Sequence, residues 1–213
     1  MLELKALLLT QGMHGMVSQV EGLAKALDID FIHEKIELNN FWKIIPPKIT
    51  PVKNFVFKNN INHNFDIVIS CGRKSVIPSI FLKRKFKNSI MNIHIQDPKV
   101  SLNNFDLIIA PEHDELKGKN VISTKGAIHY LVNDELNRNI DYLKPRINRE
   151  KIITLIVGGP NKYYNFERSI IDEIFNKIKN NFINRGFQLI FIPSMRTPKM
   201  IIDLAKNYFD DDQ

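Results

Sequence analysis

Short apolar, β-branched runs alternate along the chain with segments in which apolar residues recur every three or four positions. Several of the runs are continuously apolar, as expected for strands buried on both faces of a parallel sheet. The expected strands cover residues 4–10, 29–38, 65–70, 89–95, 105–110, 120–123, 151–157 and 187–192. Helical spacing covers residues 16–27, 75–85, 133–143 and 166–185. This alternation predicts an α/β fold of Rossmann-like parallel sheets with right-handed crossovers.

A segment that contains proline and several charged residues, 142–151, separates the first six expected strands from the last two. We therefore expect an N-terminal Rossmann-like α/β domain over residues 1–145. A partial second Rossmann-like domain, with two strand–helix units, is expected over residues 150–213. Two parallel strands alone leave unpaired edges, so either this second piece packs on the first or the chain is shorter than its parent architecture.

The composition is that of a soluble globular protein, with 44% hydrophobic and 25% charged residues. The apolar run near the start is bracketed by Glu3 and Lys5, which predicts a first strand and not a signal peptide. The single cysteine, Cys71, excludes an internal disulfide framework and is typical of a reducing compartment. No zinc-ligand spacing occurs, so no metal site is expected. With the bias toward Lys, Asn and Ile, these features predict a bacterial, cytoplasmic protein.

The formal net charge of +7 has two interpretations. It indicates an anionic partner, or it reflects a composition rich in scattered lysines. The one basic cluster is KRKFK at 83–87, for which peripheral contact with a membrane surface stays an open alternative. Aromatic and basic residues are not interleaved as in single-strand binders, so no nucleic-acid partner is expected.

Loops that follow parallel strands are the candidate sites, because ligands of open α/β sheets bind beyond the carboxyl ends of the strands. Glycine there permits positive φ and a close backbone approach to an anion, although ordinary turns would show the same glycines. Arg73 at a helix start opposes the helix dipole, which predicts a compensating anion. The candidate substrate-binding residues are Gly12, His14, Gly15, Gly72, Arg73, Gln96, Asp97 and Gly126.

Glu112, His113 and Asp114 place two carboxylates and an imidazole in the loop after the fifth expected strand. Such a triplet is able to act as a general base with its orienting acid. The alternatives are an oxygen-rich metal site and a polar surface loop, of which the polar surface loop is the commonest explanation of such a triplet. We name these three residues as the catalytic candidates.

Two donor-rich loops follow the last two expected strands. GGPNK at 158–162 is predicted to open one helix and SMRTP at 194–198 the next. Because both strands are parallel, the loops should lie side by side, and together they are suited to hold a diphosphate. The candidate ligand-binding residues are Gly158, Gly159, Asn161, Lys162, Ser194, Arg196 and Thr197.

The motifs, taken together, resemble the mitochondrial-fission "elongated mitochondria" family, whose members occur in plants and bacteria. The resemblance runs along nearly the whole chain, through segments 10–27, 41–47, 69–79, 93–98, 105–129, 155–164 and 193–198. It is most specific in IQDP, APEHD and GGPNK. The family in turn resembles the GT-B class of glycosyltransferases, in which two Rossmann-like domains face a cleft.

The resemblance implies a metal-independent, GT-B-like glycosyltransferase with a nucleotide-diphosphate sugar as donor substrate and no certain cofactor. The loop at Gly158–Lys162 would hold the donor phosphates, and the loops of the first domain would face the acceptor. The resemblance also implies that family members continue further than this sequence, through elements that grip the nucleotide, so we expect the second domain to be incomplete. The alternatives are a non-catalytic scaffold that recruits a protein partner, as plant members are described, or a fragment of a truncated gene.

Overall fold

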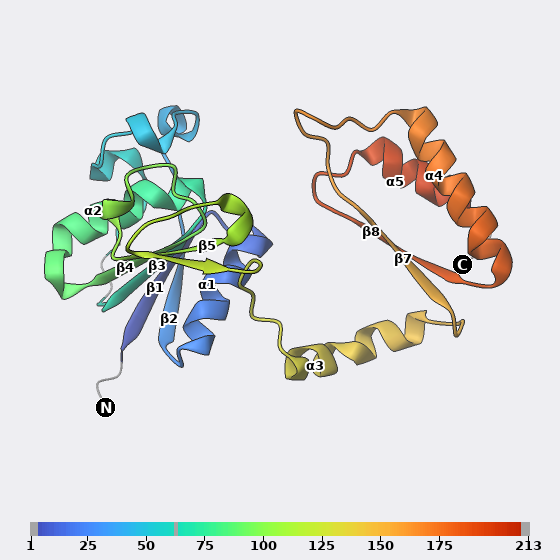
Figure 1. The fold of residues 1–213 in the computed structure, drawn as a ribbon, viewed down its shortest axis with the longest axis horizontal. Helices are drawn as coiled ribbons and strands as arrows, with labels where there is room; N and C mark the ends of the chain where they lie inside the picture. The colour runs from blue at the N-terminus through green and yellow to red at the C-terminus, as the bar shows by residue number, and fades with distance from the viewer. Residues whose placement is uncertain (1–3, 62–63, 210–213) are drawn as a thin grey trace. The chain divides into compact units, whose positions relative to one another are not determined.

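The computed structural model describes residues 4–61 and 64–209, which form two compact units. The first unit extends to Asn133 and the second begins at Asp134 (Figure 1). The predicted α/β class is confirmed, since strands and helices alternate along both units. No helix within the described ranges is long and apolar enough to cross a membrane.

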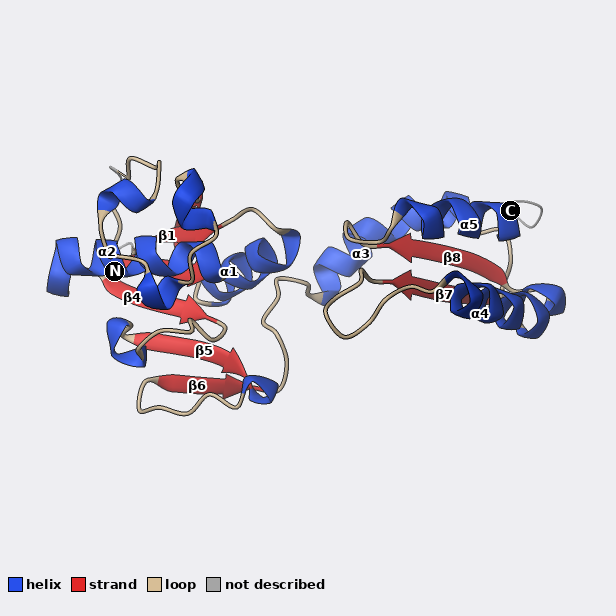
Figure 2. Ribbon diagram, turned by 90° about the horizontal axis from the view of Figure 1, so that it is seen from above, coloured by secondary structure: helices blue, strands red, loops and turns tan. Residues whose placement is uncertain are grey.

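Six parallel strands form the sheet of the first unit, in the order β2-β1-β3-β4-β5-β6. Figure 2 shows β4, β5 and β6 running in the same direction. The strands are β1 (Lys5–Thr10), β2 (Asp30–Lys35), β3 (Ile67–Cys71), β4 (Met91–Ile95), β5 (Leu107–Pro111) and β6 (Val121–Thr124). The chain moves outward from β1 to β2 and then returns to β3 on the other side of β1. The β1/β3 position is therefore the switch point at which such sheets open toward ligands.

Two helices cover opposite faces of this sheet, α1 (His14–Ala26) and α2 (Val76–Phe86). Side chains alternate between the faces, as they do in any strand. Leu7 and Leu9 join a core cluster with Ile77 and Ile80 of α2. Leu8 faces the other way, into a cluster with α1. All are buried, which explains why these strands are continuously apolar.

The crossover from β2 to β3 contains short 3-10 turns where an α-helix is usual. Pro46, Pro47 and Pro51 fall within it, and proline interrupts an α-helix by removing a donor and clashing with the preceding turn. The turns are η1 (Asn40–Lys43), η2 (Pro47–Ile49) and η3 (Asn54–Val56). The remaining 3-10 turns are η4 (Arg73–Ser75), η5 (Lys87–Ser89), η6 (Leu102–Asn104), η7 (Glu112–Asp114), η8 (Lys144–Arg146) and η9 (Ile183–Arg185).

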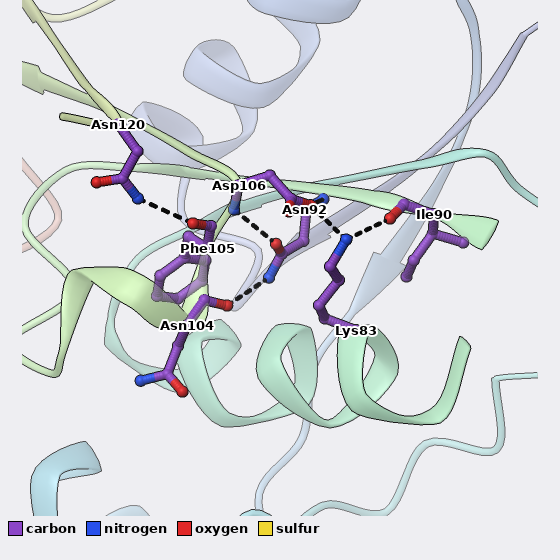
Figure 3. Close-up of polar contacts among 7 residues, drawn as sticks. All are labelled: Lys83, Ile90, Asn92, Asn104, Phe105, Asp106 and Asn120. Carbon is purple, nitrogen blue, oxygen red and sulfur yellow. Dashed lines mark hydrogen bonds and ion pairs between the residues drawn. The ribbon is translucent and has the colours of Figure 1, made fainter. Parts of the chain in front are cut away.

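A polar network fixes the amino ends of β4 and β5 (Figure 3). The Lys83 Nζ lies 2.7 Å from the Asp106 Oδ2 and donates to the Ile90 carbonyl at 2.7 Å. Asp106 Oδ2 also accepts the backbone N–H of Asn92, whose side-chain oxygen accepts the N–H of Asp106 in return. The first lysine of the KRKFK cluster is thus engaged in holding the fold together.

The second unit has two parallel strands, β7 (Ile152–Val157) and β8 (Gln188–Pro193). Its helices are α3 (Asn133–Leu143), α4 (Arg168–Asn181) and α5 (Lys199–Phe209). Phe175 of α4 and Ile201 of α5 are buried in one cluster with Val157. The prediction that GGPNK opens a helix is wrong, because residues 158–167 form an irregular loop before α4. SMRTP does lead directly into α5.

Candidate functional site

The carboxyl edge of the six-stranded sheet collects the candidate loops of the first unit. Gly12 follows β1, Gly72 follows β3, Gln96 follows β4, Glu112 follows β5 and Gly126 follows β6. Because all six strands are parallel, these loops emerge on the same edge. Gly12 and Gly72, on either side of the switch point, have φ of 82° and 86°, a conformation that glycine adopts without strain.

Met16 of α1 packs onto Gly72 at the switch point. A Cβ added at Gly72 would lie 2.5 Å from the Met16 Sδ, so the end of the flexible Met16 side chain would have to move. Gln11 Nε2 lies 3.2 Å from the same sulfur atom. The positive φ is what favours glycine after β3, and the contact with Met16 adds a packing role that the sequence motif alone does not reveal.

Arg73 is held by backbone oxygens of the β2–β3 crossover. Its Nη2 donates to the carbonyl oxygens of Lys43, Ile44 and Ile45 at 3.3, 2.8 and 2.9 Å. The negative ends of these carbonyl dipoles compensate for the unfavourable position of the arginine charge near the positive end of the helix dipole. Arg73 thus positions the 43–45 segment, and its contact with a bound anion stays a prediction.

His14 and Gly15 open α1 and are exposed. The Gly15 carbonyl accepts a hydrogen bond from Gln19 Nε2 at 3.0 Å. Gln19 is buried, and its Oε1 lies 3.4 Å from Gln96 Nε2. This chain of amides connects the loop after β1 with the loop after β4, so these two candidate loops adjoin each other.

Asp97 forms an ion pair with Lys99, whose Nζ lies 2.6 Å from the Asp97 Oδ2. The same carboxylate accepts the backbone N–H of Lys99 at 2.8 Å. Burial alone would raise the pKa of Asp97, but these hydrogen bonds and the Lys99 charge hold it below its ordinary value. Asp97 is therefore a stable anion that shapes its own loop.

The catalytic candidates Glu112, His113 and Asp114 form η7 directly after β5. His113 Nε2 lies 3.8 Å from Asp114 Oδ1, which is beyond hydrogen-bond distance, and 74% of the His113 side chain is exposed. No cluster of three His, Cys, Asp or Glu side chains able to hold a metal occurs among the described residues. The triplet is accessible to a substrate but is not preorganised as a base with its orienting acid.

A buried polar pair that the sequence reasoning missed lies beneath this edge. Ser70 Oγ and His94 Nδ1 are 2.8 Å apart on the neighbouring strands β3 and β4. Burial lowers the pKa of His94 to about 3, and a smaller opposite effect comes from Asp97. Cys71, next to Ser70, is also buried, which raises its thiol pKa to about 12. The signal for this pair is the polar residue within each otherwise apolar run.

In the second unit, Thr197 joins the two candidate loops. Its Oγ1 lies 2.7 Å from the Val157 carbonyl oxygen and 3.0 Å from that of Gly158. It accepts the N–H of Ser194 at 2.8 Å. Thr197 is only 8% exposed. Its hydroxyl is thus committed to holding the loop after β8 against the loop after β7.

Gly159 permits the closest approach between these loops. A Cβ added there would lie 2.7 Å from the Arg196 carbonyl oxygen, whereas one added at Gly158 would meet nothing within 4 Å. Asn161 Oδ1 accepts the N–H groups of Tyr163 and Tyr164, which turns the chain. The Lys162 Nζ lies 4.6 Å from the centre of the Tyr163 ring. The exposed side chains of Lys162 and Arg196 are the cations that this arrangement offers to a ligand.

Residues 14–213 match the sequence model of the family described as "Mitochondrial fission ELM1". An uncharacterized protein of Rickettsia prowazekii (strain Madrid E), RP120, is 25% identical over 177 residues, covering 67% of this chain and 49% of that protein. The "Mitochondrial fission protein ELM1" of Arabidopsis thaliana is 38% identical over 48 residues, covering 22% of this chain and 11% of that protein. The chain thus spans less than half the length of these curated relatives. No solved structure matches it.

Proposed function

From the premise that the chain belongs to the Mitochondrial fission ELM1 family, we propose that it binds a nucleotide-diphosphate sugar through the loops 158–162 and 194–198. The observation that carries this proposal is the Thr197 contact, which holds both loops together at the carboxyl edge of β7 and β8. Bound phosphate oxygens would then meet two loops at once, as a diphosphate requires.

The charge and dipole of these loops favour a diphosphate. Lys162 and Arg196 each contribute one cation, and α5 begins at Lys199, directly after the second loop. A helix start presents free N–H groups and the positive end of its dipole. Arginine binds phosphate bidentately and lysine binds it as a point charge. Together they would stabilise a departing diphosphate without a metal ion.

The first unit would supply the acceptor side of a GT-B-like sugar transfer. His113 is the group best suited to accept the proton of an acceptor hydroxyl, because its ring is exposed at the carboxyl edge. Its 3.8 Å separation from Asp114 would have to close when substrate binds, as happens for many catalytic pairs. Gly12, His14 and Gln96 would line the same side.

Isothermal titration with UDP, GDP and their sugar conjugates tests the donor site. We expect one site per chain and a loss of about tenfold or more in affinity for Lys162→Ala and for Arg196→Ala, since each removes a charge-assisted contact. Lys177→Ala is the matched control, because Lys177 is an exposed lysine of α4 that pairs with Glu173. Absence of heat at millimolar ligand, in a folded sample, would exclude the proposed donor site.

A second candidate function, a non-catalytic recruitment module, is favoured by one face of the β7–β8 sheet. Ile156 is 73% exposed and Ile192 is 45% exposed, while their neighbours Leu155 and Phe191 pack into the core. An exposed apolar face of this kind is typical of a surface that binds another protein. Ile156→Asp should abolish capture of such a partner and leave nucleotide binding unchanged, which separates the two functions in one experiment.

A further inference from the structure

A cationic groove lies beside α2 in the first unit. It has a volume of about 600 Å³ and lies between α2, η2 and the segment 99–104. Its apolar lining consists of Val52 and Val100, which are partly exposed, above Ile77 and Ile80, which are almost fully buried. Its rim carries the side chains of Lys48, Arg84 and Lys99.

The rim is positive and poorly neutralised. No carboxylate is among the residues that line the groove. Lys48 has no ion pair or side-chain hydrogen bond within the part of the chain that the structure describes. Arg84 has only a long contact, 3.5 Å from its Nη2 to the Asn104 Oδ1. Lys99 is the exception, because its charge is neutralised by the ion pair with Asp97.

The basic side chains of the KRKFK cluster have different surroundings. Lys83 pairs with Asp106 at the amino edge of the sheet, and Lys85 lies over the Phe86 ring, 5.1 Å from its centre. Among the four basic residues of the cluster, Arg84 alone lines the groove. The sequence cluster is therefore not one basic patch, and its arginine belongs to a different site.

We propose that this groove binds a single-chain amphiphile with an anionic head group, such as an alkyl phosphate. The head group would lie between Lys48 and Arg84, with Lys99 as an additional cation, and the chain would lie on Val52 and Val100, above the buried Ile77 and Ile80. A small inorganic anion would leave the exposed parts of Val52 and Val100 in contact with water. A neutral apolar ligand would remove hydration from the cations without compensating their charge. The volume is within the range of ordinary small-molecule sites.

Titration with dodecyl phosphate, below its critical micelle concentration, tests the proposal on the full chain. We expect one molecule per chain, and a loss of about tenfold in affinity for Lys48→Ala and for Arg84→Ala. Lys85→Ala, one residue along the same helix, is the matched control and should bind as the wild type does. Ser101→Trp places a large side chain at the exposed rim and should block the groove without entering the core.

Each comparison ligand overturns a different part of the proposal. Equal affinity for dodecyl maltoside would remove the role of the anionic head group. Equal affinity for inorganic phosphate would remove the role of the apolar lining. Binding to phosphatidylglycerol vesicles without binding to monomeric dodecyl phosphate would assign the cations to a membrane surface. Binding that survives both Arg84→Ala and Ser101→Trp would place the ligand elsewhere. The donor site of the second unit is independent of all four outcomes.

Discussion

Ser70 and His94 form a buried hydrogen-bonded pair at the centre of the first sheet, with 2.8 Å between Oγ and Nδ1. Ser70 Oγ also donates to the Ile93 carbonyl at 3.1 Å, so His94 Nδ1–H is the donor to Ser70. The Phe105 ring lies against the imidazole, 5.0 Å between ring centres. The neutral histidine is satisfied here, whereas a charged one would be desolvated.

This pair predicts that stability falls in weak acid. The pKa of His94 is about 3 in the folded chain and about 6.5 in the unfolded chain. Below pH 6.5 the unfolded state therefore binds a proton that the folded state does not. As the pH falls from about 6.5 to about 3, His94 therefore lowers the free energy of unfolding by about 1.4 kcal/mol per pH unit. Urea unfolding of the wild type and of His94→Gln, at several pH values between 7 and 4.5, gives the free energy of unfolding at each pH. That free energy should fall less steeply with pH for the variant than for the wild type.

An NMR titration of the folded protein checks the same prediction without a substitution. The His94 ring signals should stay constant down to pH 4.5, because burial lowers the pKa of His94 to about 3. A His94 signal that titrates near pH 6.5 would contradict the buried neutral state.

Cys71 is predicted to be unreactive in the folded protein. Burial raises its pKa to about 12, so only about one thiol in ten thousand is ionised at pH 8. Labelling with a thiol-reactive disulfide reagent should be complete in 6 M guanidinium. In buffer, labelling should be no faster than unfolding of the protein. Rapid labelling of the native protein would show that β3 opens.

Gly159 and Gly158 provide a matched pair of substitutions. Gly159→Ala should lower the free energy of unfolding of the second unit by about 1–3 kcal/mol, because the new methyl group collides with the Arg196 backbone. Gly158→Ala meets no atom within 4 Å and should change stability little. Denaturant unfolding monitored by circular dichroism measures both. Equal effects would indicate that the two loops do not touch.

Gly22 and Gly15 provide a second pair, within α1. A Cβ at Gly22 would lie 2.6 Å from the His129 carbonyl carbon, whereas one at Gly15 meets nothing within 4 Å. Gly22→Ala should destabilise the first unit, since the 128–131 segment has to move. Gly15→Ala should stabilise it by about 0.5–1 kcal/mol, the usual difference in helix propensity. Thermal unfolding of the two variants should therefore shift in opposite directions.

The order and type of the elements follow from the sequence alone, because strand and helix periodicity is a local property of each segment. All eight predicted strands exist, from β1 to β8, and the four predicted helices correspond to α1–α4 within a few residues. The continuously apolar runs predicted parallel strands. Parallel strands in turn place the candidate loops at the carboxyl edges of the sheets. The prediction that GGPNK opens a helix is wrong, because no local signal shows how far a loop extends before the next helix begins.

Tertiary structure alone decided what the side chains in those loops do. Arg73 donates hydrogen bonds to carbonyl oxygens 28 to 30 residues away. Thr197, in the loop after β8, donates to the carbonyl oxygen of Val157 at the end of β7. Met16 against Gly72 and Ser70 against His94 likewise depend on strand order. A glycine, an arginine or a polar residue within a strand is a motif in sequence, but its hydrogen-bond and packing partners come from distant segments. Its role is therefore fixed only when the sheet assembles.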